Sequence, residues 1–169
     1  MDWSAITRRV VIAAAAPHPQ DLVLVLGDDW EVASSLAVRV AQVVVRSTVA
    51  PPALPANVVV ELGVDWLDAP PPGTSVVVMH DSFGSLSTDG QHRLVKSLGA
   101  ALSPRALLVV GGVMWSMPVA VVDAPEQYGG SIQNAPTVRA FESLVREAGF
   151  LPDTHRFGVG RAVCVAIRT

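Results

Sequence analysis

The sequence has little cysteine, few aromatic residues and little charge. Its single cysteine, Cys164, excludes an internal disulfide and a zinc site built from several cysteines. Only 16% of the 169 residues are charged, and 15 acidic against 12 basic side chains give a net charge of −3. Proteins that bind nucleic acids through phosphate contacts carry basic patches, so we expect no nucleic-acid partner. Half of the chain is hydrophobic, which predicts a folded core and excludes a disordered protein.

Long hydrophobic runs are also missing. No stretch approaches the roughly 18 apolar residues of a spanning helix, so we expect no membrane association. Arg8 and Arg9 precede a short apolar stretch at 10–16, as in a signal peptide, but Pro17 stands where a cleavage site would lie. We therefore interpret residues 1–20 as an N-terminal amphipathic helix and a turn. The chain is expected to form one cytoplasmic domain, residues 1–169.

Short apolar runs alternate with helical segments along the chain. Continuous apolar runs that end at glycine or polar residues predict strands buried on both faces, at 22–26, 43–45, 58–60, 76–78 and 107–110. Capping residues and proline or glycine stops predict helices at 3–15, 31–40, 88–102 and 136–148. Gly111 and Gly112 are interpreted as a tight strand exit, and 155–159 with 162–167 as a closing antiparallel pair.

This order predicts the α/β class: a mostly parallel sheet with helices on both faces and an antiparallel strand pair at the C-terminus. Residues 117–134 are irregular in pattern, and we interpret them as a lid or a partner-binding loop. Ligands of such folds bind outside the carboxyl ends of the strands, near the point where the strand order reverses. The residues that follow each strand are therefore the candidates for chemistry.

Acidic and aromatic residues gather at these strand ends. The candidates are Gly27, Asp28, Asp29 and Trp30 after the first strand, Arg46 after the second, Asp65 and Trp66 after the third, His80 and Asp81 after the fourth, and Trp115 after the fifth. They predict an aromatic-lined, partly acidic crevice that binds a ligand. The alternative is that the tryptophan rings fill the crevice and close it.

His80 and Asp81 are the best catalytic pair in the sequence. Histidine is the usual base near pH 7, because its ordinary pKa lies close to that value. The alternative is that both side chains only bind the backbone of neighbouring loops. Histidines and carboxylates do not show metal-ligand spacing, so we expect no metal site. No Gly-x-Ser-x-Gly turn follows a strand, so a serine nucleophile is not indicated.

Several of these segments are similar to parts of the class I S-adenosylmethionine-dependent methyltransferases. Residues 61–70 resemble the acidic loop after the third strand of that family, and residues 76–82 resemble its fourth strand. Residues 107–115 are similar to its fifth strand and the following loop. A helix ending at 145–150 before a final strand pair is typical of its C-terminus. The resemblance implies a Rossmann-like fold and S-adenosylmethionine as the cofactor.

The resemblance also implies roles for the strand-end residues, and it has clear departures. It places the cofactor at Gly27, Asp28, Asp29, Asp65 and Trp66, with His80 and Asp81 as the catalytic residues. Asp29 and Glu31 stand where the family usually has glycine, so their side chains occupy ligand space, and their carboxylates repel a cofactor carboxylate unless they are compensated. Arg46 or Ser47 stands where the family has an acidic residue that holds ribose. Arginine cannot accept those hydrogen bonds.

Two functional hypotheses follow. The first is a methyltransferase that uses S-adenosylmethionine and acts on a small molecule. The second is a protein of the same fold that has lost the cofactor site and binds a partner protein, or a second copy of itself as a homodimer. A third alternative is another nucleotide or metabolite held by Arg46, because a guanidinium suits phosphate and carboxylate groups.

Overall fold

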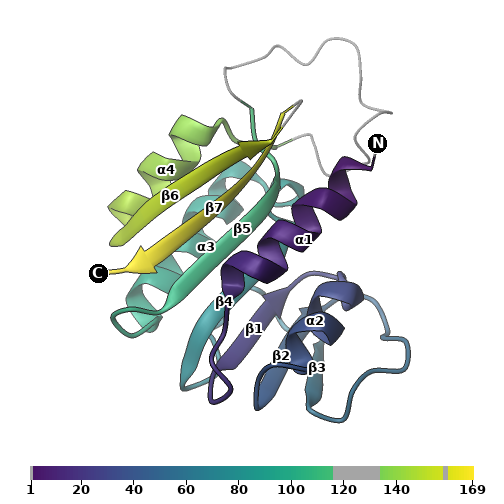
Figure 1. The fold of residues 1–169 in the computed structure, drawn as a ribbon. Helices are drawn as coiled ribbons and strands as arrows, with labels where there is room; N and C mark the ends of the chain where they lie inside the picture. Colours follow the sequence, from purple (N-terminus) through teal and green to yellow (C-terminus); the bar gives the residue numbers. More distant parts are fainter. Residues whose placement is uncertain (1, 116–133, 158–159) are drawn as a thin grey trace.

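The chain forms one seven-stranded sheet. The computed structural model describes residues 2–115, 134–157 and 160–169, so the expected irregular segment at 117–134 lies outside the described residues except for Asn134. The strand order is β3-β2-β1-β4-β5-β7-β6 (Figure 1). The strands are β1 (Leu22–Leu26), β2 (Gln42–Ser47), β3 (Val58–Leu62), β4 (Thr74–His80), β5 (Leu107–Val113), β6 (Phe150–Phe157) and β7 (Arg161–Arg168).

The first five strands are parallel, and β7 is antiparallel to both β5 and β6. The predicted parallel sheet with a C-terminal antiparallel pair is therefore confirmed. The order reverses between β1 and β4, which lie side by side although two other strands separate them in the sequence. Because the chain leaves β1 and β4 in opposite directions along the sheet, their carboxyl ends form the expected ligand crevice.

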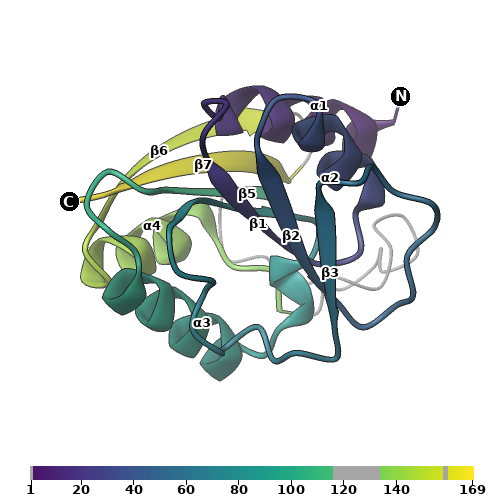
Figure 2. The same cartoon turned by 90° about the horizontal axis from the view of Figure 1, so that it is seen from below.

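Helices cover both faces of the sheet, as Figure 2 shows. On one face lie α1 (Trp3–Ala15) and α2 (Trp30–Ala37), and on the other lie α3 (Thr88–Ala101) and α4 (Val138–Glu147), with a short 3-10 turn at Phe83–Ser85. Each helix begins with a side-chain cap: Asp2, Asp29, Ser87 and Thr137 accept a hydrogen bond from a backbone N–H in the first turn. These caps satisfy amide groups that have no partner within the helix.

The central strands are buried on both faces, which explains their unbroken apolar sequence. Two hydrophobic clusters pack on opposite sides of the sheet, one around Leu24, Met79 and Phe141 and one around Val25 and Leu36. Cys164 of β7 lies in the first cluster, and burial raises the pKa of its thiol to about 11. The buried thiol therefore serves as a small hydrophobic group of the core.

Some element boundaries differ from the prediction. Gly111 and Gly112 do not end the fifth strand but lie inside β5, where a Cβ at Gly111 would collide with Val11 of α1. Glycine is needed there because α1 approaches the sheet closely. Strand β6 begins at Phe150 rather than 155, since a sheet-edge strand tolerates polar residues and Pro152. Helix α2 ends at Ala37, three residues earlier than expected.

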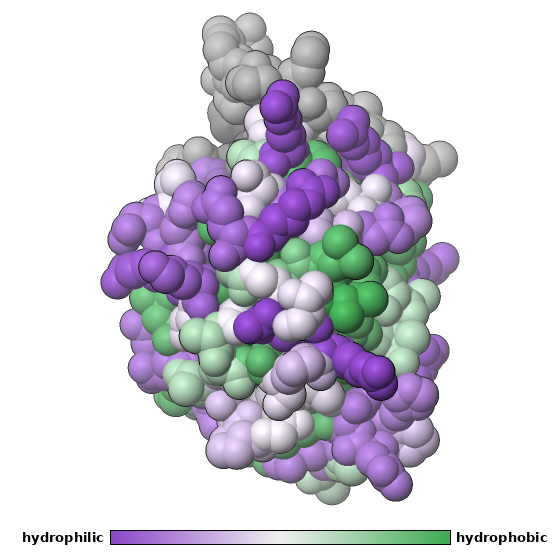
Figure 3. All heavy atoms as spheres, turned by 90° about the vertical axis from the view of Figure 1, so that its left-hand side faces the viewer, coloured by the Kyte–Doolittle hydropathy of each residue, from purple (hydrophilic) through white to green (hydrophobic). Residues whose placement is uncertain are grey.

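The two edges of the sheet are less covered than its centre. Val59 and Leu62 of β3 are 45% and 54% exposed. At the opposite edge Leu151 pairs with Ile167 across β6 and β7, and both are exposed. Figure 3 views the molecule from this second side and shows hydrophobic residues intermixed with hydrophilic ones. In the described part of the chain, no helix is long and apolar enough to span a membrane.

Candidate functional site

A pocket of about 520 Å³ lies at the carboxyl ends of β1 and β4. It is the place at which the strand order reverses and where the sequence predicted a crevice. Its lining comes from α1, the β1–α2 turn, the loop after β3 and the end of β4, with the residues Ser4, Arg8, Gly27, Asp28, Asp29, Trp30, Glu31, Trp66, His80, Asp81, Ser82 and Ser85. Six of the seven residues predicted for the site therefore line one pocket. Asp65 is the exception.

Gly27 makes the tight turn that leads from β1 into the pocket. Its φ of +124° lies in a region that L-residues rarely adopt. A Cβ at this position would stand 2.8 Å from the Cβ of Ser82 in the loop after β4. The Ser82 hydroxyl donates to the Leu26 carbonyl over 2.8 Å, so the two loops touch at this point. Glycine is thus required by the close approach of β1 and β4.

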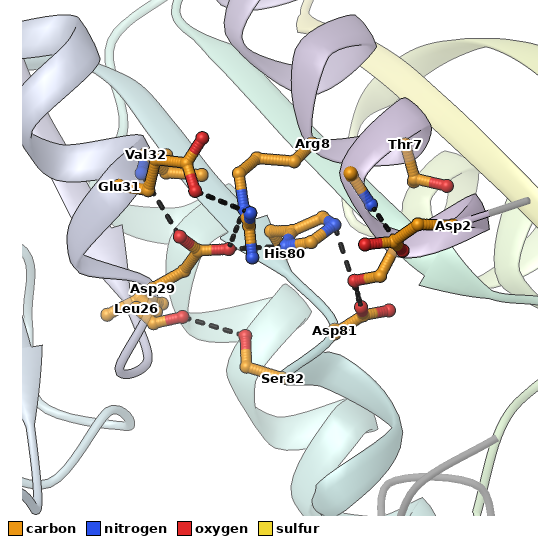
Figure 4. Close-up of polar contacts among 12 residues, drawn as sticks. Asp2, Thr7, Arg8, Leu26, Asp29, Glu31, Val32, His80, Asp81 and Ser82 are labelled. Atoms are coloured by element: carbon orange, nitrogen blue, oxygen red, sulfur yellow. Dashed lines mark hydrogen bonds and ion pairs between the residues drawn. The ribbon is translucent and has the colours of Figure 1, made fainter.

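Asp29 lies at the centre of a network of side chains. Its Oδ2 accepts from Arg8 Nε at 2.8 Å and lies 2.6 Å from His80 Nδ1 (Figure 4). Its Oδ1 caps α2 by accepting from the Val32 N–H. Arg8 reaches from α1 and also donates to Glu31, at 2.6 Å. The expected crowding of carboxylates at the glycine positions is therefore real, but Arg8 compensates it.

The network fixes the protonation of Asp29 and the orientation of His80. Burial alone would raise the pKa of Asp29, but hydrogen bonds from His80, Arg8 and the Val32 N–H lower it to about 2. An ionised carboxylate only accepts, so Nδ1 of His80 must carry the proton in this contact. In a neutral imidazole Nε2 is then the acceptor. His80 Nε2 is buried and has no hydrogen-bond partner among the described residues.

Asp81 follows His80, and its carboxylate accepts hydrogen bonds from α1 and from β7. Its Oδ1 accepts from Arg161 of β7 at 2.7 Å, and its Oδ2 accepts from Ser4 of α1 at 2.6 Å. Oδ2 also lies 3.6 Å from His80 Nε2. The backbone of Asp81 has a φ of +54°, a left-handed conformation that aspartate adopts more readily than most other non-glycine residues. The interpretation that His80 and Asp81 bind only loop backbone is therefore wrong.

Asp28 also lines the pocket, but its contacts differ from those of Asp29. Its Oδ1 accepts from the hydroxyl of Ser47, the last residue of β2, at 2.5 Å. Ser47 is fully buried, whereas Asp28 is exposed. The contact places a carboxylate beside the end of β2, although β2 itself ends in arginine and serine. Asp28, in the turn between β1 and α2, thus supplies a carboxylate acceptor next to the end of β2.

Two of the tryptophans line the pocket, and Trp115 lies outside its lining. Trp66 and Trp30 line the pocket without filling it, so the alternative of a closed crevice does not hold. Trp30 is the first residue of α2 rather than part of a loop. Trp115 packs beside Gly160 and does not belong to the pocket lining. Asp65 is exposed and accepts from the Leu67 N–H at 2.9 Å, which shapes its own loop.

Arg46 has a structural role. Its guanidinium is 5% exposed, and each nitrogen donates to a protein acceptor: Nε to Glu61 at 2.7 Å, and Nη1 and Nη2 to the carbonyls of Asp68 and Ala69 at 2.8 Å. These contacts fasten the proline-rich loop that follows β3. They argue against the alternative in which Arg46 holds an anionic ligand, because its donors are already engaged.

Ser4, Arg8 and Arg161 bind carboxylates of the site and were not predicted from the sequence. Each lies far in the sequence from the group that it binds, and only the packing of α1 and β7 brings it there. The sequence held one hint of this arrangement. Ser4 and Arg8 are polar residues four positions apart, so they lie on the same face of a helix that packs on the sheet. In the described part of the chain no group of three histidine, cysteine or carboxylate side chains could hold a metal ion.

Comparison with known proteins gives no match by sequence and clear matches by structure. No protein-family model and no curated protein matches the chain. Human N-acetylserotonin methyltransferase in complex with SAM superposes with a TM-score of 0.73 at 14% identity, over 97% of this chain and 52% of that one. This chain thus spans about half the length of the human enzyme.

Two further solved structures cover more of their own length. The putative methyltransferase in complex with the Trm112 activator of Haloferax volcanii has a TM-score of 0.75 at 12% identity, over 95% of this chain and 88% of that one. The [4+2]-cyclase SpnF has a TM-score of 0.74 at 14% identity, over 98% and 81%. The chain has the class I methyltransferase fold. Because SpnF is named as a cyclase, the same fold also carries other functions.

Proposed function

We propose that the chain binds S-adenosylmethionine in the β1–β4 pocket and transfers a methyl group to a small molecule. The observation that carries this proposal is His80, a buried imidazole whose Nδ1 is held by Asp29 and whose Nε2 has no hydrogen-bond partner among the described residues. A base needs that arrangement, because the carboxylate fixes the tautomer and leaves the second nitrogen free to accept a proton.

The residues around the pocket fit this cofactor class. The human enzyme that superposes on this chain is in complex with SAM, and the two share the fold. Trp66 offers a flat apolar surface for a base, and Asp28 offers carboxylate oxygens near the end of β2 for hydroxyl groups. When bound, S-adenosylmethionine supplies an electrophilic methyl group.

The chain's own residues then have separate tasks. His80 Nε2 accepts the proton of an acceptor hydroxyl or amine, and Asp29 stabilises the imidazolium that forms. Asp81, fixed by Arg161 and Ser4, stands 3.6 Å from Nε2, so one donor group between them can bind both acceptors. The negative balance of the whole chain disfavours a nucleic-acid acceptor.

A methyl-transfer assay tests the proposal. The full chain is incubated with S-adenosylmethionine and a panel of small phenols, alcohols and amines, and the release of S-adenosylhomocysteine is measured. We expect turnover that falls about 100-fold or more in His80→Gln, because a positioned base contributes at least that much. His155→Gln is the matched control, since His155 is exposed on β6 outside the pocket. Equal turnover in both variants contradicts the role of His80.

A second candidate is a binding protein that has lost catalysis. The observation that favours it is the side chains of Asp29 and Glu31 at the turn, where Arg8 ties α1 to α2 over the pocket. The Haloferax volcanii neighbour is in complex with an activator protein, which shows a partner for that protein. A chain that binds neither S-adenosylmethionine nor its demethylated product, but forms a homodimer or a stable complex, would fit this candidate.

A further inference from the structure

The pocket lining carries more acidic than basic side chains. Four carboxylates line it, and they are Asp28, Asp29, Glu31 and Asp81. Arg8 is the arginine of the lining, and Arg161 reaches one of these carboxylates from β7. Two arginines and one histidine therefore face four carboxylates, so the formal balance of charge is negative.

The two arginines neutralise some of these carboxylates but not Asp28. Arg8 pairs with Asp29 and Glu31, and Arg161 pairs with Asp81. Asp28 accepts only from the neutral hydroxyl of Ser47, and within the described ranges no Lys, Arg or His lies within ion-pair distance of it. The sequence has no Lys, Arg or His at 116–133 or 158–159.

A second feature of the pocket also points to a ligand. His80 lines the pocket, its side chain is only 2% exposed, and its buried Nε2 has no hydrogen-bond partner among the described residues. Figure 4 shows that end of the ring turned toward Asp81, which also lines the pocket and whose Oδ2 stands 3.6 Å from Nε2. A buried acceptor without a donor costs free energy unless a ligand or water supplies one. The carboxylate of Asp28, which has no cationic partner, and the Nε2 atom of His80, which lacks a donor, both favour a cationic or hydrogen-donating ligand.

We propose that this pocket selects its ligand by positive charge and binds S-adenosylmethionine, a sulfonium cation, more tightly than S-adenosylhomocysteine, the neutral thioether. The inference rests on the proposed function, because it concerns the same pocket. It adds that Asp28 is a specificity-determining residue. A preference of this sign favours exchange of the spent product for fresh cofactor.

Calorimetric titration of the full chain with the two ligands tests the inference, and binding is measured without any methyl acceptor. At low salt we expect S-adenosylmethionine to bind about fivefold more tightly, which is the ratio that one unit-charge interaction of about 1 kcal/mol near water gives. Sinefungin, which carries a protonated amine in place of the sulfonium, should bind like the cofactor. In 1 M salt the Debye length falls to about 3 Å, so the ratio should approach one.

Two variants move the preference in opposite directions. Asp28→Asn removes the uncompensated charge with little change in shape and should bring the affinity ratio close to one. Arg8→Gln removes the lining arginine and should raise the ratio above the natural value. Asp153→Asn is the matched control for a lost carboxylate, because Asp153 is 80% exposed on β6, and its ratio should be unchanged. Thermal melts verify that each variant is folded at the titration temperature.

The outcomes separate this inference from the proposed function. Equal or tighter binding of S-adenosylhomocysteine by the natural chain overturns the charge selection while the proposed cofactor site stands. A preference that survives Asp28→Asn unchanged overturns the role of Asp28. If no ligand binds, the proposed function fails, and the inference fails with it.

Discussion

Asp28 and Asp29 are adjacent in the sequence and both line the pocket, yet their exposure and contacts contrast. Asp29 is 12% exposed, and it is held by Arg8, His80 and the first turn of α2. Asp28 is exposed, and its one side-chain bond goes to the neutral hydroxyl of Ser47. Asp29 caps α2 and orients His80, whereas Asp28 keeps its carboxylate accessible to solvent. Two consecutive aspartates therefore differ in role: one is held in a network of side chains, and the other stays open to the solvent.

Removal of Asp29 should give the largest effect. Asp29→Ala deletes the cap of α2 and leaves Arg8 and His80 without their shared acceptor. We expect the free energy of unfolding to fall by about 2–4 kcal/mol, measured by urea denaturation. Glu31→Ala is the control, because Glu31 is 68% exposed and its ion pair should contribute no more than about 0.5 kcal/mol. Similar losses in both variants would show that Asp29 is not the centre of the network.

Acid should weaken the contribution of Asp29 specifically. The pKa of Asp29 is about 2 in the folded chain, against an ordinary value of 3.8, so its contribution is complete above about pH 4 and is lost as the pH falls toward 2. The loss is about 2 kcal/mol. Denaturation curves between pH 5 and pH 2 measure it. Asp29→Asn should show a shallower decline, and an equal slope in both chains would contradict the assignment.

The turn that precedes the two aspartates should tolerate little change. Gly27→Ala places a Cβ 2.8 Å from that of Ser82 and forces an L-residue to a φ of +124°. We expect a loss of about 1–3 kcal/mol. Gly63→Ala is the comparison: its φ is +69°, but a Cβ there meets nothing within 4 Å, so its cost should stay near about 1 kcal/mol. Thermal melts rank the two.

The smallest effect on stability is expected at the exposed Asp28. Asp28→Asn keeps the shape of the side chain and its acceptor oxygen toward Ser47, so the free energy of unfolding should change by less than about 0.5 kcal/mol. Urea denaturation beside Asp29→Asn provides the direct contrast. A loss at Asp28 as large as that at Asp29 would mean that both carboxylates are structural.

Local patterns in the sequence were sufficient for the fold and for most of the pocket. Unbroken apolar runs such as 22–26 identify buried parallel strands, and the residues that follow them meet at one edge because the strands are parallel. Edge strand β6 was placed five residues late, since its polar sequence resembles a loop. The partners Arg8 and Arg161 depend on contacts across the sheet, which no local pattern encodes. The repulsion expected at Asp29 and Glu31 was therefore corrected only by the structure.

The most direct test of a cofactor site in the β1–β4 pocket is the binding of S-adenosylmethionine to the natural chain. The full chain is titrated in a calorimeter at low salt, and its melting temperature is followed at the same ligand concentrations. We expect saturable binding of one molecule per chain with a rise in melting temperature, because a ligand that binds only the folded state stabilises it. No heat and no thermal shift at millimolar ligand would contradict the account and favour a binding protein without a cofactor.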